Sequence, residues 1–189
     1  LRVATLRPTL DSGVTVNGEV FRPGNFAWRD GLRLSDVIGS VSDLRPNADQ
    51  HYLLIRRETG AERRITAVSA DLDAALAARG SDADVPLMPR DQIMVFDLST
   101  SRDRLVKPLI NELKLQASPG APAQVVSVSG RVKDAGDYPL DAGMHVSDLV
   151  RAGGGLEDAA YSGKAELSRY VVENGQLRRT QVQSIDLGA

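Results

Sequence analysis

The stretch Val14-Thr-Val-Asn-Gly-Glu-Val20 recurs further along the chain as Val126-Ser-Val-Ser-Gly-Arg-Val132. Each of its valines and its glycine reappears at a constant offset of 112 positions, the offset from Gly18 to Gly130. A repeated stretch of this kind indicates a chain built from copies of one structural unit. The same offset, without a gap, relates Gly24 to Gly136, Phe26 to Tyr138, Gly31 to Gly143, Ser35-Asp36 to Ser147-Asp148, Leu44 to Leu156 and Ala48 to Ala160.

Beyond this stretch the offset between the two copies grows by three residues. The new offset relates Gly60 to Gly175 and Asp71 to Asp186, so we place a short insertion around Tyr161-Ser-Gly-Lys164 of the second copy. The first copy continues for roughly 25 residues past the point that matches Ala189, as judged from the repeat register. We therefore expect the second repeat to be truncated, or to receive its last strand from elsewhere.

Both copies begin with a predicted hairpin. Alternating valines, as at Val14 and Val16, indicate a half-buried strand. A glycine-containing turn follows, Arg22-Pro23-Gly24-Asn25 in the first copy, and a second strand then completes the hairpin. In the second copy this strand contains Pro139, which has no N–H to donate, so we expect it to lie at a sheet edge or to end there.

A short helix is predicted after each hairpin. Ser35 and Ser147 are good N-cap residues, and the acids that follow them, Asp36 and Asp148, lie at the positive end of the helix dipole. Gly153 is expected to end the helix of the second copy in the left-handed conformation.

The first copy continues with a second hairpin, a helix and a closing strand. The hairpin runs through residues 52–57 and 63–68, and Asp71 is expected to cap a helix over residues 72–79. An apolar strand over residues 92–96 closes the copy. The order ββαββ(α)β describes an α+β sheet with a helix across it.

The repeat divides the chain into three segments. A first domain spans residues 10–97, and a second, incomplete domain spans residues 125–189. Residues 98–124 between them are expected to form a helical linker, in which Pro108 either kinks the helix or begins its second half. The linker prediction rests on apolar residues at helical spacing: Leu105, Val106, Leu109, Ile110 and Leu113.

The composition disfavours several classes of protein. The net charge is −2, whereas a nucleic-acid binder usually carries a basic excess, so we expect no nucleic-acid partner. The absence of cysteine excludes disulfide frameworks and thiolate metal sites. No apolar run approaches the ~18 residues of a membrane span, so we expect no membrane contact within the chain. The chain begins at Leu1 without a signal sequence, and we expect it to be a piece of a longer polypeptide.

The polar residues predict neither catalysis nor metal binding. His51 and His145 are the two histidines of the chain, and they lack the spacing to further ligands that a metal site needs. His145, Ser147 and Asp148 are triad residue types, but residues this close at a helix start cannot form the relay. Gly163-Lys164 lacks the earlier glycine and the following Ser or Thr of a phosphate loop. We therefore expect no enzyme activity, no metal and no cofactor.

Aromatic and arginine side chains are the candidates for contacts with a glycan or a neighbouring subunit. Aromatic rings near hairpin turns can stack on sugars, but the match between Phe26 and Tyr138 favours packing in the core. A solvated strand face is the simpler interpretation of the paired arginines. The candidate contacts are Trp28, Arg29, Arg33, Arg56 and Arg57.

The combined pattern resembles the soluble-ligand-binding β-grasp (SLBB) domain. The resemblance rests on Val-x-Val-x-Gly-x-Val, then Pro-Gly-x-Phe/Tyr, then Gly-x-x-Val/Leu-Ser-Asp-Leu/Val. The segment Pro89-Arg-Asp-Gln-Ile-Met-Val95 resembles the closing strand of that family, with Arg90 where glycine is usual. The residues that carry the structural signature are Gly18, Pro23, Gly24, Gly31, Asp36, Gly130, Gly136, Gly143 and Asp148.

Two such copies and a joining helix are similar to outer-membrane polysaccharide export proteins of Gram-negative bacteria. The resemblance implies an α+β fold with two tandem β-grasp repeats, the second truncated, joined by a helical linker. It also implies a periplasmic location, as part of an outer-membrane-associated protein. The implied partners are polysaccharide, further copies of the same protein in a homo-oligomer, and an inner-membrane polysaccharide co-polymerase.

The role that the resemblance implies is positional rather than chemical. The repeats would stack and oligomerise as part of a conduit for capsular polysaccharide or exopolysaccharide. A small-ligand or cofactor-binding module is the alternative, since β-grasp domains also hold soluble ligands. An enzyme that acts on glycans is a weaker hypothesis, and the net charge of −2 argues against a DNA-uptake module.

Overall fold

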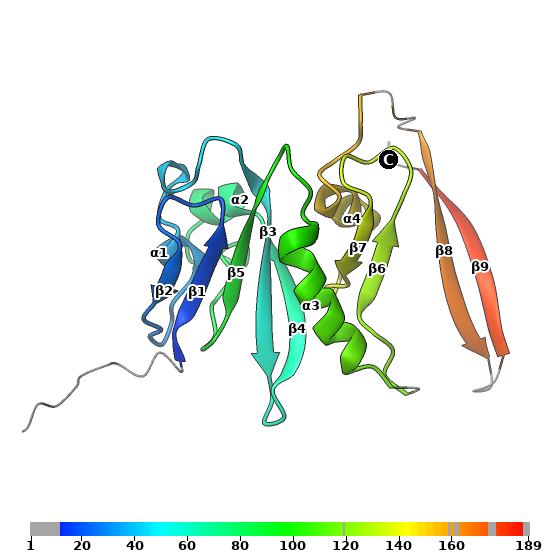
Figure 1. The fold of residues 1–189 in the computed structure, drawn as a ribbon, viewed down its shortest axis with the longest axis horizontal. Coiled ribbons are helices and arrows are strands. Elements are labelled where there is room, and N and C mark those ends of the chain that lie inside the picture. The colour runs from blue at the N-terminus through cyan, green and yellow to red at the C-terminus, as the bar shows by residue number, and fades with distance from the viewer. Residues whose placement is uncertain (1–11, 119, 159, 161–162, 174–176, 187–189) are drawn as a thin grey trace, which may run out of the picture.

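The structure is a computed structural model that describes residues 12–186 apart from 119, 159, 161–162 and 174–176. Figure 1 shows a five-stranded sheet, a helix beside it and, beyond that helix, two hairpins with a further helix. The first repeat forms the five-stranded sheet, and the second repeat forms the two hairpins.

The first repeat is one mixed sheet with the strand order β2-β1-β5-β3-β4. The closing strand β5 lies at its centre, parallel to β1 and antiparallel to β3. The α+β class and the order ββαββ(α)β are therefore confirmed. The elements are β1 (Val14–Gly18), β2 (Gly24–Phe26), α1 (Leu34–Val37), the 3-10 helix η2 (Val41–Asp43), β3 (Ala48–Thr59), β4 (Arg64–Ala70), α2 (Leu72–Ala77) and β5 (Gln92–Asp97).

One face of this sheet carries the core of the first repeat. The alternation of a strand places Val14 and Val16 of β1 on that face together with Ile93 and Val95 of β5, and all four are buried. Residues of α1 and α2 belong to the same core cluster. Full burial of an aliphatic side chain contributes roughly 1.5–3 kcal/mol, so this face accounts for much of the stability of the repeat.

The second repeat reproduces the first hairpin and the helix that follows it. An isolated bridge between Val20 and Leu44 in the first repeat recurs between Val132 and Leu156, at the offset of the sequence repeat. The internal repeat is therefore a structural repeat. Its reproduced elements are β6 (Val125–Val128), β7 (Gly136–Pro139), in which Pro139 is the last residue as predicted, and α4 (Val146–Ala152).

The second hairpin of this repeat is separate from the first. β8 (Lys164–Glu173) and β9 (Leu177–Asp186) pair with each other over ten residues and form a sheet of two strands. Among the described residues the second repeat has no counterpart of β5, which joins the two hairpins in the first repeat. The described part of the chain therefore forms an incomplete second repeat, as predicted.

The helix between the repeats is α3 (Asp103–Leu115), and it runs through Pro108 without interruption. Its buried face, with Val106 and Leu113, packs in a second core cluster. That cluster contains Tyr52 of β3 from the first repeat and Tyr138 of β7 from the second. The predicted linker is therefore helical, but it lies in a core that the two repeats share.

The predicted serine caps of the short helices are wrong. In the first repeat the helix begins at Leu34, and the N-cap residue is Arg33, whose N–H donates to Asp36 Oδ2 at 3.0 Å. Since the aspartate satisfies the cap N–H, the Ser35 hydroxyl is left to donate to the buried Asp84 Oδ2 at 2.8 Å. The second repeat does the same, with the pair His145 and Asp148 at 2.9 Å.

The predicted left-handed end of α4 is displaced by one residue. Gly153 has a φ of −77°, and the left-handed residue is Gly154, with a φ of 77°. The helix continues for one residue more than expected because the N–H of Gly153 still bonds to the carbonyl of Leu149.

Gly18 and Gly130 hold the same position in the two repeats but have different surroundings. Both are left-handed, with φ values of 95° and 93°. A Cβ on Gly18 would lie 1.9 Å from the backbone oxygen of Val95 in β5. A Cβ on Gly130 would meet no described atom within 4 Å. In the first repeat both the left-handed backbone and the closeness of β5 require glycine. In the second repeat only the left-handed backbone does.

This difference predicts unequal effects of the same substitution. We expect Gly130→Ala to lower the free energy of unfolding by about 1–2 kcal/mol, the cost of a left-handed non-glycine residue. Gly18→Ala should lower it by about 1–3 kcal/mol more, because β5 must also move. Urea denaturation of the two variants measures the difference. Equal losses would show that the contact of Gly18 with β5 carries no energy.

Candidate functional site

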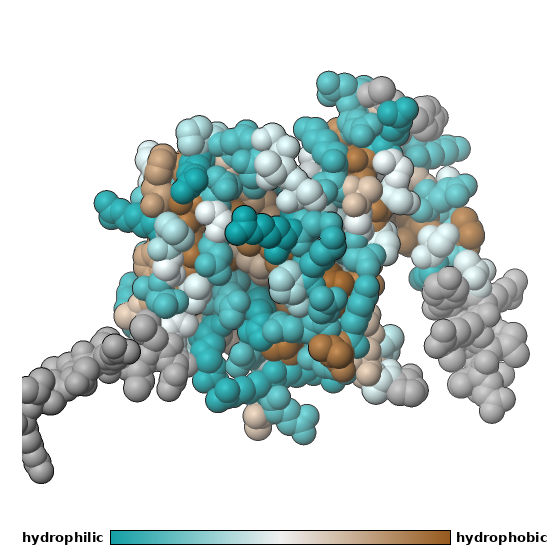
Figure 2. Space-filling model, viewed as in Figure 1, coloured by the Kyte–Doolittle hydropathy of each residue, from teal (hydrophilic) through white to brown (hydrophobic). Residues whose placement is uncertain are grey.

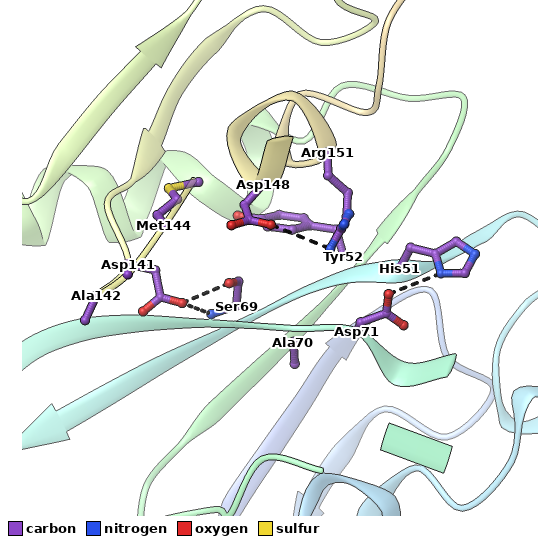
Figure 3. A pocket seen from close by; sticks show the side chains of 11 residues that line it. His51, Tyr52, Ser69, Ala70, Asp71, Asp141, Ala142, Met144, Asp148 and Arg151 are labelled. Carbon is purple, nitrogen blue, oxygen red and sulfur yellow. Dashed lines mark hydrogen bonds and ion pairs between the residues drawn. The ribbon is translucent and has the colours of Figure 1, made fainter. Parts of the chain in front are cut away.

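A polar cleft of about 210 Å³ lies where the two repeats meet. One wall comes from β3, β4 and the start of α2, and the other comes from α4 and the loop before it (Figure 3). Two chain segments far apart in the sequence therefore build it. The lining residues are His51, Tyr52, Ser69, Ala70, Asp71, Asp141, Ala142, Gly143, Met144, Asp148 and Arg151.

Asp141 fastens the second repeat to the edge strand of the first. Its Oδ2 accepts two hydrogen bonds from Ser69, one from the backbone N–H and one from the hydroxyl, both at 2.8 Å. Figure 3 shows this pair on one side of the cleft. A carboxylate that accepts bonds from a strand edge is held in one orientation, so Asp141 is a fixed acceptor of the cleft.

The other charged groups of the cleft are held by their own helices. Asp71 caps α2 by accepting from the N–H of Ala74 at 3.0 Å, and its second oxygen lies 3.3 Å from His51 Nδ1. Asp148 closes the start of α4 and lies 3.8 Å from the guanidinium of Arg151. Three carboxylates thus face one arginine and one histidine, which makes the cleft a polar site with more acceptors than donors.

Tyr52 forms the buried side of the cleft, with 2% of its surface exposed. Its hydroxyl is the one buried side-chain polar atom of the described residues that has no hydrogen-bond partner. Burial raises the pKa of Tyr52, and Arg102 opposes the rise while Asp141 and Asp49 add to it. The hydroxyl is therefore a neutral donor, and a buried donor without an acceptor is unusual enough to mark a site.

Arg102 lies behind the ring of Tyr52 and is 3% exposed. Its Nη2 donates to Asp49 Oδ2 at 2.5 Å, and its Nη1 donates to the carbonyl of Ala152 at the end of α4 at 2.9 Å. Its guanidinium carbon also lies 5.3 Å from the ring centre of Tyr52 and 5.0 Å from that of Phe96. One side chain thus connects β3, β5, α3 and α4 under the cleft.

A second connection lies beside Arg102. The carboxylate of Asp134 accepts from the backbone N–H of Arg102 at 2.7 Å and from the Ser101 hydroxyl at 3.1 Å. The Tyr138 hydroxyl donates to the carbonyl of Asp134 at 2.8 Å, and burial is the main cause of the raised pKa of Tyr138. The start of α3 is therefore tied to the β6–β7 hairpin, which keeps the two walls of the cleft together.

A second hollow, of about 330 Å³, lies on the connection between β5 and α3. Acidic and basic side chains line it, among them Asp97, Lys133 and Glu157. The carboxylate of Asp97 accepts hydrogen bonds from Ser99, from Asn47 and from the N–H of Thr100, and its pKa is lowered chiefly by the bond from the Ser99 N–H. Because its acidic group is committed to shaping a turn, this hollow is a weaker candidate site than the cleft.

Comparison with protein families identifies the repeats. The model of the SLBB domain matches residues 14–64 and residues 125–181, which together make up more than half of the chain. The chain belongs to the SLBB domain family. The two matched segments begin at the two copies of the repeated strand, and the predicted SLBB resemblance is thereby confirmed. The comparison with curated proteins gave no match.

In the part of the chain that the structure describes, no helix is long and apolar enough to cross a membrane. Across the same residues, no group of three or more His, Cys, Asp or Glu side chains is arranged to hold a metal ion.

None of the five candidate contacts from the sequence lines the cleft. Arg57 is buried and pairs with Asp91 at 2.7 Å, inside the first SLBB repeat. Arg56 joins β3 to α3 through Glu112 at 2.7 Å. Both arginines therefore hold elements of the fold together, where the sequence favoured a solvated strand face.

The other three candidates lie at the end of the first repeat away from α3. Trp28 packs against the core and donates from Nε1 to the carbonyl of Leu87 at 2.9 Å, which fits the predicted core role of the aromatic residues. Arg33 donates to the carbonyl of Asp84 at 2.5 Å. Arg29 is the most exposed of the five, with 67% of its side chain accessible and Asp36 at 3.3 Å.

Asp141, which fastens the two walls of the cleft, escaped the sequence reasoning because the two copies differ at its position. Asp141 occupies the position that Arg29 holds in the first copy, so the two copies carry opposite charges there. This change of charge between otherwise similar copies is the feature of the sequence that could have pointed to Asp141. Where the two copies differ at one position but match around it, the differing residue can make a contact between the repeats.

Because the Tyr52 hydroxyl has no hydrogen-bond partner, its removal should leave the stability of the fold almost unchanged. Tyr52→Phe should change the free energy of unfolding by less than about 0.5 kcal/mol or stabilise the fold, because no hydrogen bond is lost. Tyr138→Phe is the matched control, and it should cost about 0.5–1.5 kcal/mol because it removes the bond to Asp134. Thermal denaturation of the two variants tests this. A loss of more than 1 kcal/mol for Tyr52→Phe contradicts the assignment of a free hydroxyl.

Breaking the buried ion pair of Arg102 and Asp49 should lower the stability of the fold strongly. Arg102→Met should lower the free energy of unfolding by about 3–5 kcal/mol, since Asp49 is left as a buried charge without its partner. Adding Asp49→Asn should restore part of the loss. Arg131→Met is the control, because its pair with Glu157 is exposed and contributes less than about 1 kcal/mol. Urea denaturation gives all of these values, and similar losses for Arg102→Met and Arg131→Met would refute the prediction.

Proposed function

We propose that this chain is a structural and binding module of a protein that exports capsular polysaccharide or exopolysaccharide. The SLBB family supports a soluble ligand-binding module, and the export role follows from the similarity of the tandem arrangement to export proteins. In this proposal the module lies in the periplasm, as part of an outer-membrane-associated protein.

The observation that carries the proposal is the shared core between the repeats. Helix α3 packs against both repeats, and Arg102 and Asp134 tie its start to both. Two domains joined by a mobile linker would change their spacing freely. Two repeats with a common core instead form one body of constant length, and a wall built by stacking needs such a unit.

The mechanism in this proposal is positional. The carboxylates of the cleft are occupied with the N–H groups of Ser69, Ala74 and His145, and these bonds hold the cleft in shape. The Ser69 hydroxyl, which donates to Asp141 at 2.8 Å, belongs to these structural bonds, because the same carboxylate oxygen also accepts from the Ser69 N–H. We therefore propose that the module binds and guides a polymer without changing it.

The proposed partners are the polysaccharide, further copies of the protein in a homo-oligomer, and an inner-membrane polysaccharide co-polymerase. The face in Figure 2 is mainly hydrophilic, with hydrophobic side chains in small separate patches. Exposed apolar residues such as Phe21 and Leu115 lie far apart in the sequence. A surface of this kind fits wet, polar contacts with a glycan or with neighbouring subunits.

A small-ligand-binding module is the second candidate function, and the cleft favours it. Its volume of about 210 Å³ is below the ~300–1,000 Å³ of most small-molecule sites, so it fits one ring-sized group. Fixed acceptors at Asp71 and Asp141, together with the exposed donor Arg151, suit a group with several hydroxyls. A single sugar unit meets this description, either as part of a polymer or as a free ligand.

Titration of the chain with polysaccharides tests the proposed function. We expect saturable binding of a neutral, hydroxyl-rich capsular polysaccharide with a Kd below about 1 mM, measured by calorimetry and by NMR shifts of the Ser69 and Asp141 amides. Arg151→Met should weaken binding about 5–10-fold through the loss of an accessible hydrogen-bond donor of the cleft, and Arg131→Met, outside the cleft, should not.

The outcomes of this titration separate the candidate functions. Binding of the polymer but not of free monosaccharides supports the export module, and binding of a free sugar or a cofactor alone supports the small-ligand module. The absence of binding for all of them, or release of reducing ends from the polymer, would contradict the proposed function.

A further inference from the structure

The cleft between the repeats carries an unbalanced charge. Asp71, Asp141 and Asp148 line it, and Arg151 is the one lysine or arginine among its lining residues. With His51 neutral, three negative charges and one positive charge give the cleft a formal charge of −2. The whole chain of 189 residues also has a net charge of −2. A small cleft thus holds as large an excess of negative charge as the entire chain.

Two carboxylate oxygens of the cleft are open to a ligand. Asp141 accepts both bonds from Ser69 on its Oδ2. Asp148 accepts the N–H of His145 on its Oδ2 at 2.9 Å, and its Oδ1 lies 3.8 Å from Arg151, too far for a hydrogen bond. In the described part of the chain no hydrogen bond reaches the Oδ1 atom of either aspartate. Each aspartate therefore uses one oxygen for the fold and leaves the other as an acceptor.

The positions of these two acceptors are fixed before any ligand binds. Ser69 of β4 holds Asp141, and the start of α4 holds Asp148. Figure 3 shows both carboxylates beside the space between α4 and the strands of the first repeat. Groups that are already ordered lose little conformational freedom when a ligand binds, so their full attraction contributes to affinity.

The cations near the cleft compensate its charge only in part. The Arg151 side chain is 47% exposed, and an ion pair as open as its pair with Asp148 contributes less than about 1 kcal/mol. Arg102 lies below the cleft, but it is buried and pairs with Asp49 at 2.5 Å. The negative charge of the cleft is therefore left for a ligand to balance.

Tyr52 provides an observation that is independent of the charge. It lines the cleft with 2% of its surface exposed, and its hydroxyl has no hydrogen-bond partner. Buried polar groups are almost always paired in folded proteins, so an unpaired hydroxyl in the lining points to a polar site that is completed by something other than this chain.

The remaining lining residues suit a ring better than a bare ion. Ala70, Ala142 and Met144 add apolar surface to the cleft, which the C–H face of a sugar ring can cover. A metal ion needs several ligands in one place, and in the described ranges no group of three His, Cys, Asp or Glu side chains is arranged to hold one. The charge and the lining together therefore fit an organic cation on a ring.

We propose that the cleft selects a sugar unit that carries a protonated primary amine. This inference rests on the proposed function, in which the cleft binds one unit of a polymer. The ammonium group lies beside Asp141 Oδ1 and Asp148 Oδ1, and its three N–H donors can bond to both oxygens. The ring hydroxyls face Arg151, and the ring packs on the apolar side of the cleft.

Two oligosaccharides of the same length test the proposal on the intact chain. One is a plain glucose oligomer, and the other carries primary amines in place of its primary hydroxyls, so that it is positively charged at pH 7. Since a hydrogen bond to a charged group is stronger than a neutral one, we expect calorimetry to give the aminated oligomer a Kd at least about 10-fold lower.

The result also separates this proposal from the proposed function. Equal affinity for the two oligomers, or tighter binding of the plain one, overturns the selection of an amine and leaves the binding module in place. The absence of binding for both overturns the two proposals together.

Variants of the cleft locate the selection. Asp141→Asn and Asp148→Asn each keep an acceptor for the structural bonds but remove one negative charge, and each should lower the preference for the aminated oligomer at least about 3-fold. Arg151→Met should raise that preference, because it removes the competing cation. Glu62→Gln is the matched control, since Glu62 is exposed in the turn between β3 and β4, at the other end of β4 from Ser69. An unchanged preference in both aspartate variants, or an equal drop in the control, overturns the proposal.

A lysine peptide tests the other source of an ammonium group. A lysine side chain supplies the same charge without a sugar ring, so a lysine peptide with as many amines as the aminated oligomer should bind at least about 10-fold more weakly. Equal or tighter binding of the peptide would assign the cleft to a polypeptide partner and overturn the proposal.

Discussion

The buried pair of Arg102 and Asp49 is the interaction on which the arrangement of the two repeats depends. Each side chain is almost inaccessible to water, and removing an ion from water costs several kcal/mol unless a partner compensates. Arg102 also requires the carbonyl of Ala152 at the end of α4. Hydrophobic burial contributes more free energy, but it is non-directional and does not by itself fix how the two repeats are oriented. Because these bonding groups come from β3, from the start of α3 and from the end of α4, satisfying all of them fixes one placement of the repeats.

That placement creates the cleft and gives the chain a constant length. Asp141 reaches Ser69 only because α4 and its preceding loop are held against β3 and β4. The Tyr52 hydroxyl is left without a partner in the same place, where its ring is held by Arg102 and by stacking on Phe96. A site between repeats and a rigid body for assembly are thus two consequences of one set of contacts. The proposed binding and stacking roles therefore do not compete.

The sequence predicted what depends on local pattern and missed what depends on packing. The strands, the hairpins and α3 follow from the alternation of valines and from helical spacing, and both act over a few residues. The buried state of Arg57 depends on Asp91, which lies just before β5, 34 positions later. Paired arginines give no sign of such a partner. The cleft joins Ser69 to Asp141 across 72 positions, at a place where the copies differ, so no repeat pattern could indicate it.

The two repeats together show what the central strand contributes to the fold. The hairpin β6–β7 and helix α4 form without a β5 counterpart among the described residues, and they pack instead against α3 and the first repeat. The core of the first repeat is complete because β5 lies between β1 and β3, although it follows them in the chain. β1 and β2 are joined by a short loop, as are β3 and β4, but β5 is joined to neither of its partners by a tight turn. β5 therefore pairs on both sides with strands to which no tight turn joins it, and the sheet of the first repeat is continuous only because this distant segment returns to its centre.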